Sequence, residues 1–242
     1  MSDDNTLYSD EEIIPFPEIG DRLFVTEQNS HHNAQVNYIH SWDTFNRYVL
    51  GYKEAADRLA RSLLEDHHHL DLVVFPLVFL YRQYLELRLK QILLEGNILL
   101  DKRFALPIHH HIDRLWSECK SLLKQVEPAM KDQEVAALET CILEFSTIDP
   151  SSMAFRYHVD PHDNPSLPPD LRYINIRNLA QVMAKIDSFF NAAYMTITVS
   201  LERKNLDELD EKFEGVLRDY YQEDWQGPSV EPYAPPMATS WL

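Results

Sequence analysis

Hydrophobic residues recur in steps of three and four along most of this 242-residue chain, and this spacing predicts amphipathic helices. The predicted helices cover residues 41–66, the segment after His69 as far as Gly96, 111–125, 132–146, 175–199 and 205–223. No convincing strand-like alternation and no internal repeat interrupt them. The pattern therefore predicts an all-α fold, an antiparallel bundle of about five to six helices.

The same pattern divides the chain into three parts. Residues 1–40 are predicted to form an acidic N-terminal arm, residues 41–200 the helical bundle, and residues 201–242 an acidic helix followed by a proline-rich tail. Within the bundle, residues 147–170 are rich in Pro, Ser and Asp and predict a long loop. Loops of this length in a compact domain usually carry function or are disordered.

Composition narrows the class of protein further. The chain has only 5 glycines and lacks a glycine-rich phosphate-binding motif, which disfavours an all-β or dinucleotide-binding fold. Its 2 cysteines form no CxxC pair, and the first residues lack the basic and apolar parts of a signal peptide. No apolar run has the length of a membrane span. We expect a cytoplasmic protein without a membrane segment.

The net charge of −17 is concentrated at the two ends of the chain. Residues 1–30 hold 8 acids and 1 base, and residues 201–242 hold 10 acids and 4 bases. In contrast, residues 80–125 hold 8 bases and 5 acids. This distribution indicates either a solvated surface with acidic tails or a local basic groove that could meet RNA or a nucleotide.

The first group of candidate functional residues lies within the second predicted helix. Arg82, Glu86 and Lys90 are successive i,i+4 neighbours, so they share one strip of that helix. Their flanking residues are strongly apolar. The strip is therefore either an exposed row of ion pairs or a polar site inside the protein, where the charges would need partners.

A second group lies where the third helix is predicted to begin. His110 stands between two other histidines, and a histidine can act as a general acid or base near neutral pH. Arg103 precedes it and could stabilise a phosphate. The alternative is capping and surface polarity. Neither histidine run has the spacing of a zinc site, and we expect no metal and no cofactor.

The third group lies in the long loop. Arg156 and His158 alternate with aromatic residues there, and an arginine between aromatic rings is often anchored by stacking. These two side chains could reach a phosphate and complete a site. They could equally belong to a loop that closes over the bundle.

Four short motifs occur in a fixed order along residues 70–195. They are Phe-Pro-x-x-Phe-Leu-Tyr-Arg with Leu-Glu-Leu-x-Leu-Lys (75–90), His-x-Ile-Asp-x-Leu-Trp (110–116), Asp-Pro-Ser-Ser-x-x-Phe-Arg-Tyr (149–157) and Ile-Arg-Asn-Leu (176–179). In this order the motifs resemble a group of bacterial HEPN-like proteins. The resemblance implies a helical bundle, often dimeric, whose long helices build a polar cleft.

The resemblance implies one of two functions. The first is a metal-independent endoribonuclease of a toxin–antitoxin or antiphage system, in which His110 is the general acid or base. Arg82, Arg103 or Arg156 would then bind the scissile phosphate, Glu86 and Asp113 would orient these groups, and Lys90 and His158 would line the site. The second function is an inactive module that binds a nucleotide or a partner protein. One reason for this second function is the acidic character of the two chain ends. The other is the start of the late helix, Arg172–Arg177, because active HEPN proteins carry a histidine a few residues after an arginine there and this chain does not.

Overall fold

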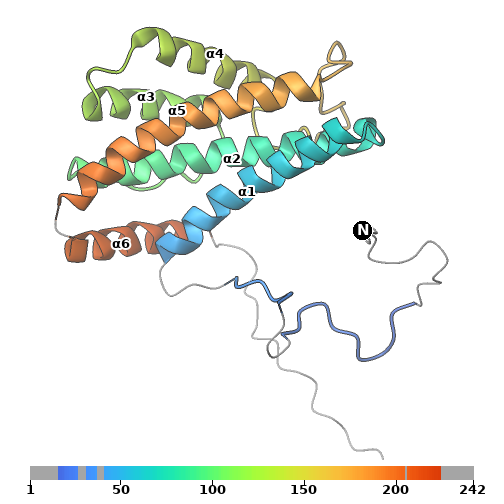
Figure 1. Cartoon of the computed structure of the whole chain (residues 1–242), viewed down its shortest axis with the longest axis horizontal. Coiled ribbons are helices and arrows are strands. Elements are labelled where there is room, and N and C mark those ends of the chain that lie inside the picture. The colour runs from blue at the N-terminus through green and yellow to red at the C-terminus, as the bar shows by residue number, and fades with distance from the viewer. Residues whose placement is uncertain (1–15, 27–30, 37–40, 205, 225–242) are drawn as a thin grey trace, which may run out of the picture. The chain divides into compact units, whose positions relative to one another are not determined.

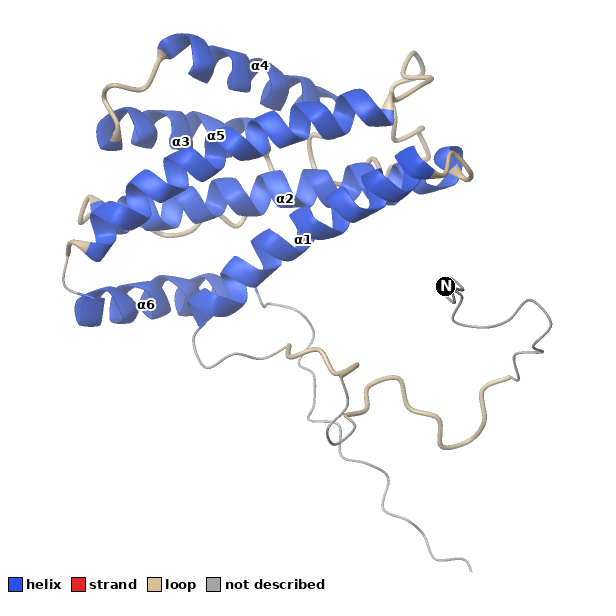
Figure 2. Ribbon diagram, viewed as in Figure 1, coloured by secondary structure: helices blue, strands red, loops and turns tan. Residues whose placement is uncertain are grey.

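Six helices make up the fold in the part of the chain that the computed structural model describes, which is residues 16–26, 31–36, 41–204 and 206–224. They are α1 (Ser41–Glu65), α2 (Leu70–Leu99), α3 (Ile112–Val126), α4 (Asp132–Ile148), α5 (Ile176–Glu202) and α6 (Leu206–Asp224). Figure 2 shows helices joined by loops, and no strand occurs in these ranges. The prediction of an all-α helical bundle is confirmed.

The chain separates into two units, residues 1–37 and 38–242. Of the first unit, residues 16–26 and 31–36 contain turns and bends without a helix. All six helices belong to the second unit, and the predicted division at residues 40 and 200 stays a prediction. The C-terminal residues 225–242, predicted as a proline-rich tail, lie outside the described residues.

Helix α2 is the centre of the bundle. It contacts α1, α3, α5 and α6, and Figure 1 shows it running beside α1, with α5 crossing it toward its C-terminal end. Most residues between Leu77 and Ile98 are buried, on every side of the helix. α2 therefore lacks the polar stripe of an amphipathic helix, whereas α1 keeps one and buries Phe45, Val49 and Ala56 in the predicted spacing.

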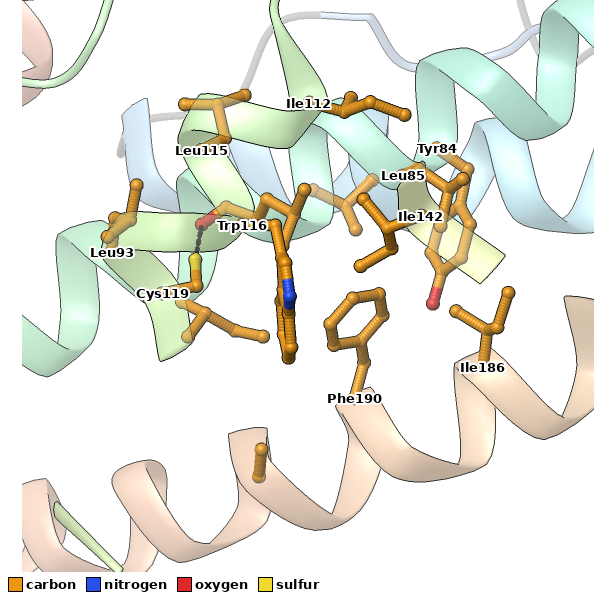
Figure 3. Packing of buried hydrophobic residues seen from close by; sticks show 14 of the residues in the cluster. Tyr84, Leu85, Leu93, Ile112, Leu115, Trp116, Cys119, Ile142, Ile186 and Phe190 are labelled. Carbon is orange, nitrogen blue, oxygen red and sulfur yellow. Dashed lines mark hydrogen bonds between the residues drawn. The ribbon is translucent and has the colours of Figure 1, made fainter. Parts of the chain in front are cut away.

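Aromatic rings fill the space between α3 and α5. The Trp116 ring lies edge-on to Phe190, with the ring centroids 6.5 Å apart, and both side chains are buried (Figure 3). Beside them the Cys119 thiol donates a hydrogen bond to the Leu89 carbonyl of α2 at 3.2 Å. This packing fixes α3 against α2 and so positions the segment that precedes α3.

The prediction that the second helix ends at Gly96 is wrong. α2 continues to Leu99, and Gly96 lies inside it, buried against Leu122 of α3. A methyl group at this position would overlap the Leu122 side chain. The glycine therefore permits close approach of two helices, and sequence spacing alone does not separate this role from that of a helix cap.

Among the described residues, none of the helices combines the length and the apolar character that crossing a membrane requires.

Two glycine substitutions test the close approach of α2 and α3. Gly51→Ala, on the exposed surface of α1 with open space around it, is expected to stabilise the protein by about 1 kcal/mol through helix propensity. Gly96→Ala gains the same propensity but overlaps Leu122, which costs about 1–3 kcal/mol, so it is expected to destabilise. Urea denaturation measures both. Equal stabilisation by the two changes would contradict the close contact.

Candidate functional site

Arg82 holds three segments of the bundle together. Its side chain is 0% exposed, and its guanidinium donates to the carbonyl of Asp149 at 3.2 Å and to the carbonyl of His110 at 2.5 Å. A third donor reaches Glu86 Oε2 at 3.3 Å. Arg82 thus joins α2 to the residues just before α3 and just after α4. A buried guanidinium needs such partners, because water cannot satisfy its donors.

Glu86 is the anion at the centre of this site, and its side chain is 1% exposed. Oε1 lies 3.1 Å from Lys90 Nζ and 2.8 Å from His110 Nδ1. Burial alone would raise the pKa of Glu86, but the hydrogen bond from His110 and the charges of Lys90 and Arg82 outweigh it and lower the pKa to about 2. Glu86 is therefore ionised at neutral pH.

His110 is the exposed member of the cluster, with 55% of its side chain open to solvent. Because Glu86 is a carboxylate, it accepts the hydrogen bond, and His110 Nδ1 carries the proton. This leaves Nε2 as the ring nitrogen that can take up or release a proton. A carboxylate that fixes an exposed imidazole in this way is a reasonable arrangement for acid–base chemistry.

Lys90 and Asp113 complete the surroundings of this pair. Lys90 is 1% exposed and also donates to the Tyr220 hydroxyl of α6 at 3.1 Å. Asp113, in the first turn of α3, accepts a hydrogen bond from Ser146 of α4 at 3.3 Å and lies close enough to favour the charged form of Arg82. Both residues are thereby used to hold helices together.

The remaining predicted residues lie apart from this cluster. Arg103 is exposed in the connection before α3, and in residues 41–204 it makes no side-chain hydrogen bond or ion pair. Arg156 donates to the Ser152 carbonyl at 2.6 Å and stacks over the Phe79 ring at 5.4 Å. Stacking between Arg156 and aromatic rings was predicted, and it is confirmed.

His158 and Arg156 line a separate cavity of about 410 Å³ together with Phe75 and Phe155. No hydrogen bond, ion pair or ring contact within the described residues connects either of them with His110. The structure thus brings together Arg82, Glu86, Lys90, His110 and Asp113, and it leaves Arg103, Arg156 and His158 outside that group.

A second buried polar network lies on α2, and the sequence pattern did not predict it. Arg88 is 2% exposed, stacks over Tyr194 of α5 at 4.8 Å, and donates to Asn191 of α5 and to Gln91. Gln91 in turn donates to Asn46 of α1 at 3.1 Å. The i,i+3 spacing of Arg88 and Gln91 was a weak signal. The residues of α1 and α5 that satisfy them have no signal in the local sequence.

One turn further along α2 lies Glu95, which is 1% exposed. Burial raises its pKa well above the usual range for a carboxyl group. Oε2 accepts a hydrogen bond from Thr198 of α5 at 3.4 Å, and Oε1 has no hydrogen-bond partner. The pKa values of the two glutamates are therefore shifted in opposite directions, because His110, Lys90 and Arg82 outweigh burial at Glu86, whereas burial outweighs the charge of Arg88 at Glu95.

No three His, Cys, Asp or Glu side chains gather into a metal-binding group in the part of the chain that the structure describes. The three histidines at 109–111 do not point toward one common position. His110 turns to Glu86, whereas the rings of His109 and His111 lie 5.8 Å apart.

The lowered pKa of Glu86 predicts a specific loss of stability in acid. Because the folded-state pKa of about 2 lies below the ordinary value of 4.5, the carboxylate contributes its stability above pH 4.5 and loses it as the pH falls through 2. The difference corresponds to about 3 kcal/mol. Glu86→Gln should be less stable than the wild type at pH 7 and should lack this part of the acid-induced loss.

Urea denaturation between pH 7 and pH 2 measures the effect. Glu54→Gln, which removes a 57% exposed carboxylate paired with Arg58, serves as the control and should keep the wild-type pH dependence. If Glu86→Gln also keeps it, Glu86 is not the paired anion described here.

In comparisons with known proteins, no family model matches this chain, and no curated protein and no solved structure matches it. Membership of the HEPN superfamily therefore stays a prediction based on the order of the four motifs. The geometry of the polar cluster is the basis on which a function is proposed.

Proposed function

We propose that this protein is a non-catalytic, HEPN-like helical module that acts by binding a nucleotide or a partner protein. One observation carries the proposal. Arg82, one of the three arginines predicted to bind a scissile phosphate, is fully buried and uses its donors to join α2 to the residues next to α3 and α4.

Two other positively charged side chains of the predicted site, Lys90 and Arg156, are also occupied by protein groups. Lys90 is buried and paired with Glu86 and Tyr220, so it is not accessible to a phosphate in this structure. Arg156 is held on the loop backbone and on the Phe79 ring. Phosphoryl chemistry requires cations preorganised around the position of the phosphate. Here the cations are preorganised around Glu86 and around protein carbonyls.

A second candidate function is the metal-independent endoribonuclease. It is favoured by the exposed imidazole of His110 fixed by Glu86 at 2.8 Å. In this candidate His110 is the general acid or base, Glu86 orients it, and Arg103 is the arginine still available for the scissile phosphate. Arg82, Lys90 and Asp113 would then be supporting residues that hold the dyad in place.

Assembly and location belong to the same proposal. A homodimer is supported by the resemblance to HEPN-like proteins, and Tyr48 of α1 with Met195 and Val199 of α5 are exposed apolar side chains available to an interface. A cytoplasmic location is supported by two unpaired cysteines, Cys119 and Cys141. Much of the two acidic ends, which would attract a basic protein partner, lies outside the described residues.

Incubation of the purified protein with labelled tRNA and mixed RNA in the presence of a metal chelator tests the non-catalytic assignment. Wild type and His110→Ala should both leave the RNA intact, because no cation of the cluster is available for a phosphate. His158→Ala is the matched control, since it removes an exposed histidine outside the cluster.

The endoribonuclease candidate predicts the opposite result. RNA cleavage by the wild type and by His158→Ala, with a loss of about a hundredfold or more in His110→Ala, would establish the second candidate.

A further inference from the structure

A cavity of about 720 Å³ lies at the end of the bundle where α1 turns into α2 and where α5 begins. It is separate from the polar cluster, since none of Arg82, Glu86, Lys90 and His110 lines it. Its volume is within the range of pockets that hold small organic molecules.

The walls of the cavity are mostly aliphatic and aromatic. Leu63 comes from α1, Val74 and Phe75 from α2, and Phe155 and Leu171 from the long loop. Phe155 is only 6% exposed and also lines two adjoining cavities of about 280 Å³ and 410 Å³. A ligand bound in this cavity would therefore contact a fixed apolar surface that extends into the two adjoining cavities.

Basic groups outnumber acidic ones along the lining of this cavity. Arg172, Arg177 and His67 contribute to it, against the single carboxylate of Asp71. In residues 41–204 neither arginine side chain makes a hydrogen bond or an ion pair. In a chain of net charge −17, two arginines without an acidic partner beside one cavity are complementary to an anion.

We propose that this cavity binds an organic anion with a long aliphatic body, of the fatty-acyl carboxylate class. The carboxylate would meet Arg172 and Arg177, and the chain would lie along Val74, Phe155 and Leu171. A nucleotide fits less well, because most of the lining is apolar and, besides the two arginines, only His67, Asp71, Tyr173 and Asn175 offer polar side chains to a base and ribose. The inference rests on the proposed function in one respect, that the ligand is bound and not converted.

Isothermal titration calorimetry with octanoate, decanoate and dodecanoate, each below its micelle concentration, tests the aliphatic part. One site is expected, with affinity rising about fourfold for each methylene that enters the cavity. Dodecanol, which has the same chain and no charge, should bind at least tenfold more weakly than dodecanoate.

Variants test the position of the head group. Arg172→Gln combined with Arg177→Gln should weaken dodecanoate binding by tenfold or more, whereas Arg218→Gln on the exposed face of α6 should leave it unchanged. Leu171→Trp, which fills the cavity from the half-buried loop, should weaken all three carboxylates. Far-UV circular dichroism checks that each variant keeps its helices.

Several outcomes would overturn the inference. They are the absence of dodecanoate binding, binding at many sites that the arginine variants do not affect, equal binding of dodecanol, and tighter binding of a nucleoside monophosphate than of dodecanoate. None of these depends on the RNA experiment. Cleavage of RNA would remove the proposed function and leave carboxylate binding intact, and the failure of carboxylate binding would leave the RNA result unchanged.

Discussion

A guanidinium that is cut off from water must give its donors to protein atoms, and Arg82 imposes this requirement at the centre of the bundle. Two of its partners are backbone carbonyls, at His110 and Asp149, which places the start of α3 and the end of α4 against the same turn of α2. The third is Glu86, whose second oxygen fixes His110 and Lys90. The site therefore exists because burying one arginine required several other groups to take fixed positions.

The same requirement applies along the rest of α2. Because this helix is buried on all sides, its polar side chains contact several neighbours: Gln91 reaches α1, Arg88 and Glu95 reach α5, and Lys90 reaches α6. Apolar packing alone tolerates small shifts of one helix along another, whereas a buried hydrogen-bonded pair tolerates none without leaving a donor or acceptor unsatisfied. The polar residues of α2 therefore set the register of the bundle, and the apolar residues supply most of its stability.

Sequence periodicity predicted much of this fold, and its failures have physical causes. The stripe of α1 and the strip Arg82–Glu86–Lys90 follow from helical spacing, and the prediction left open whether that strip was exposed or buried. The spacing of hydrophobic residues could not decide whether the strip on α2 was exposed or buried, because a helix that is buried on every face has no polar stripe. The partners of Arg88 and Glu95 come from residues about 100 positions away and leave no local pattern. The cavity beside Phe155 was missed because it forms only when the long loop folds onto α2 and α5.

A double-mutant cycle on Arg82 and Glu86 tests most directly whether the cluster is structural. Arg82→Met and Glu86→Gln should each destabilise the folded protein by about 3–5 kcal/mol in urea denaturation, since each leaves a buried partner unpaired. The double variant should be more stable than the sum of the two losses by about 1–3 kcal/mol, because the surviving charge is removed as well. If each single change costs less than about 1 kcal/mol and the two effects add, Arg82 does not hold the bundle together, and the account of its buried charge is contradicted.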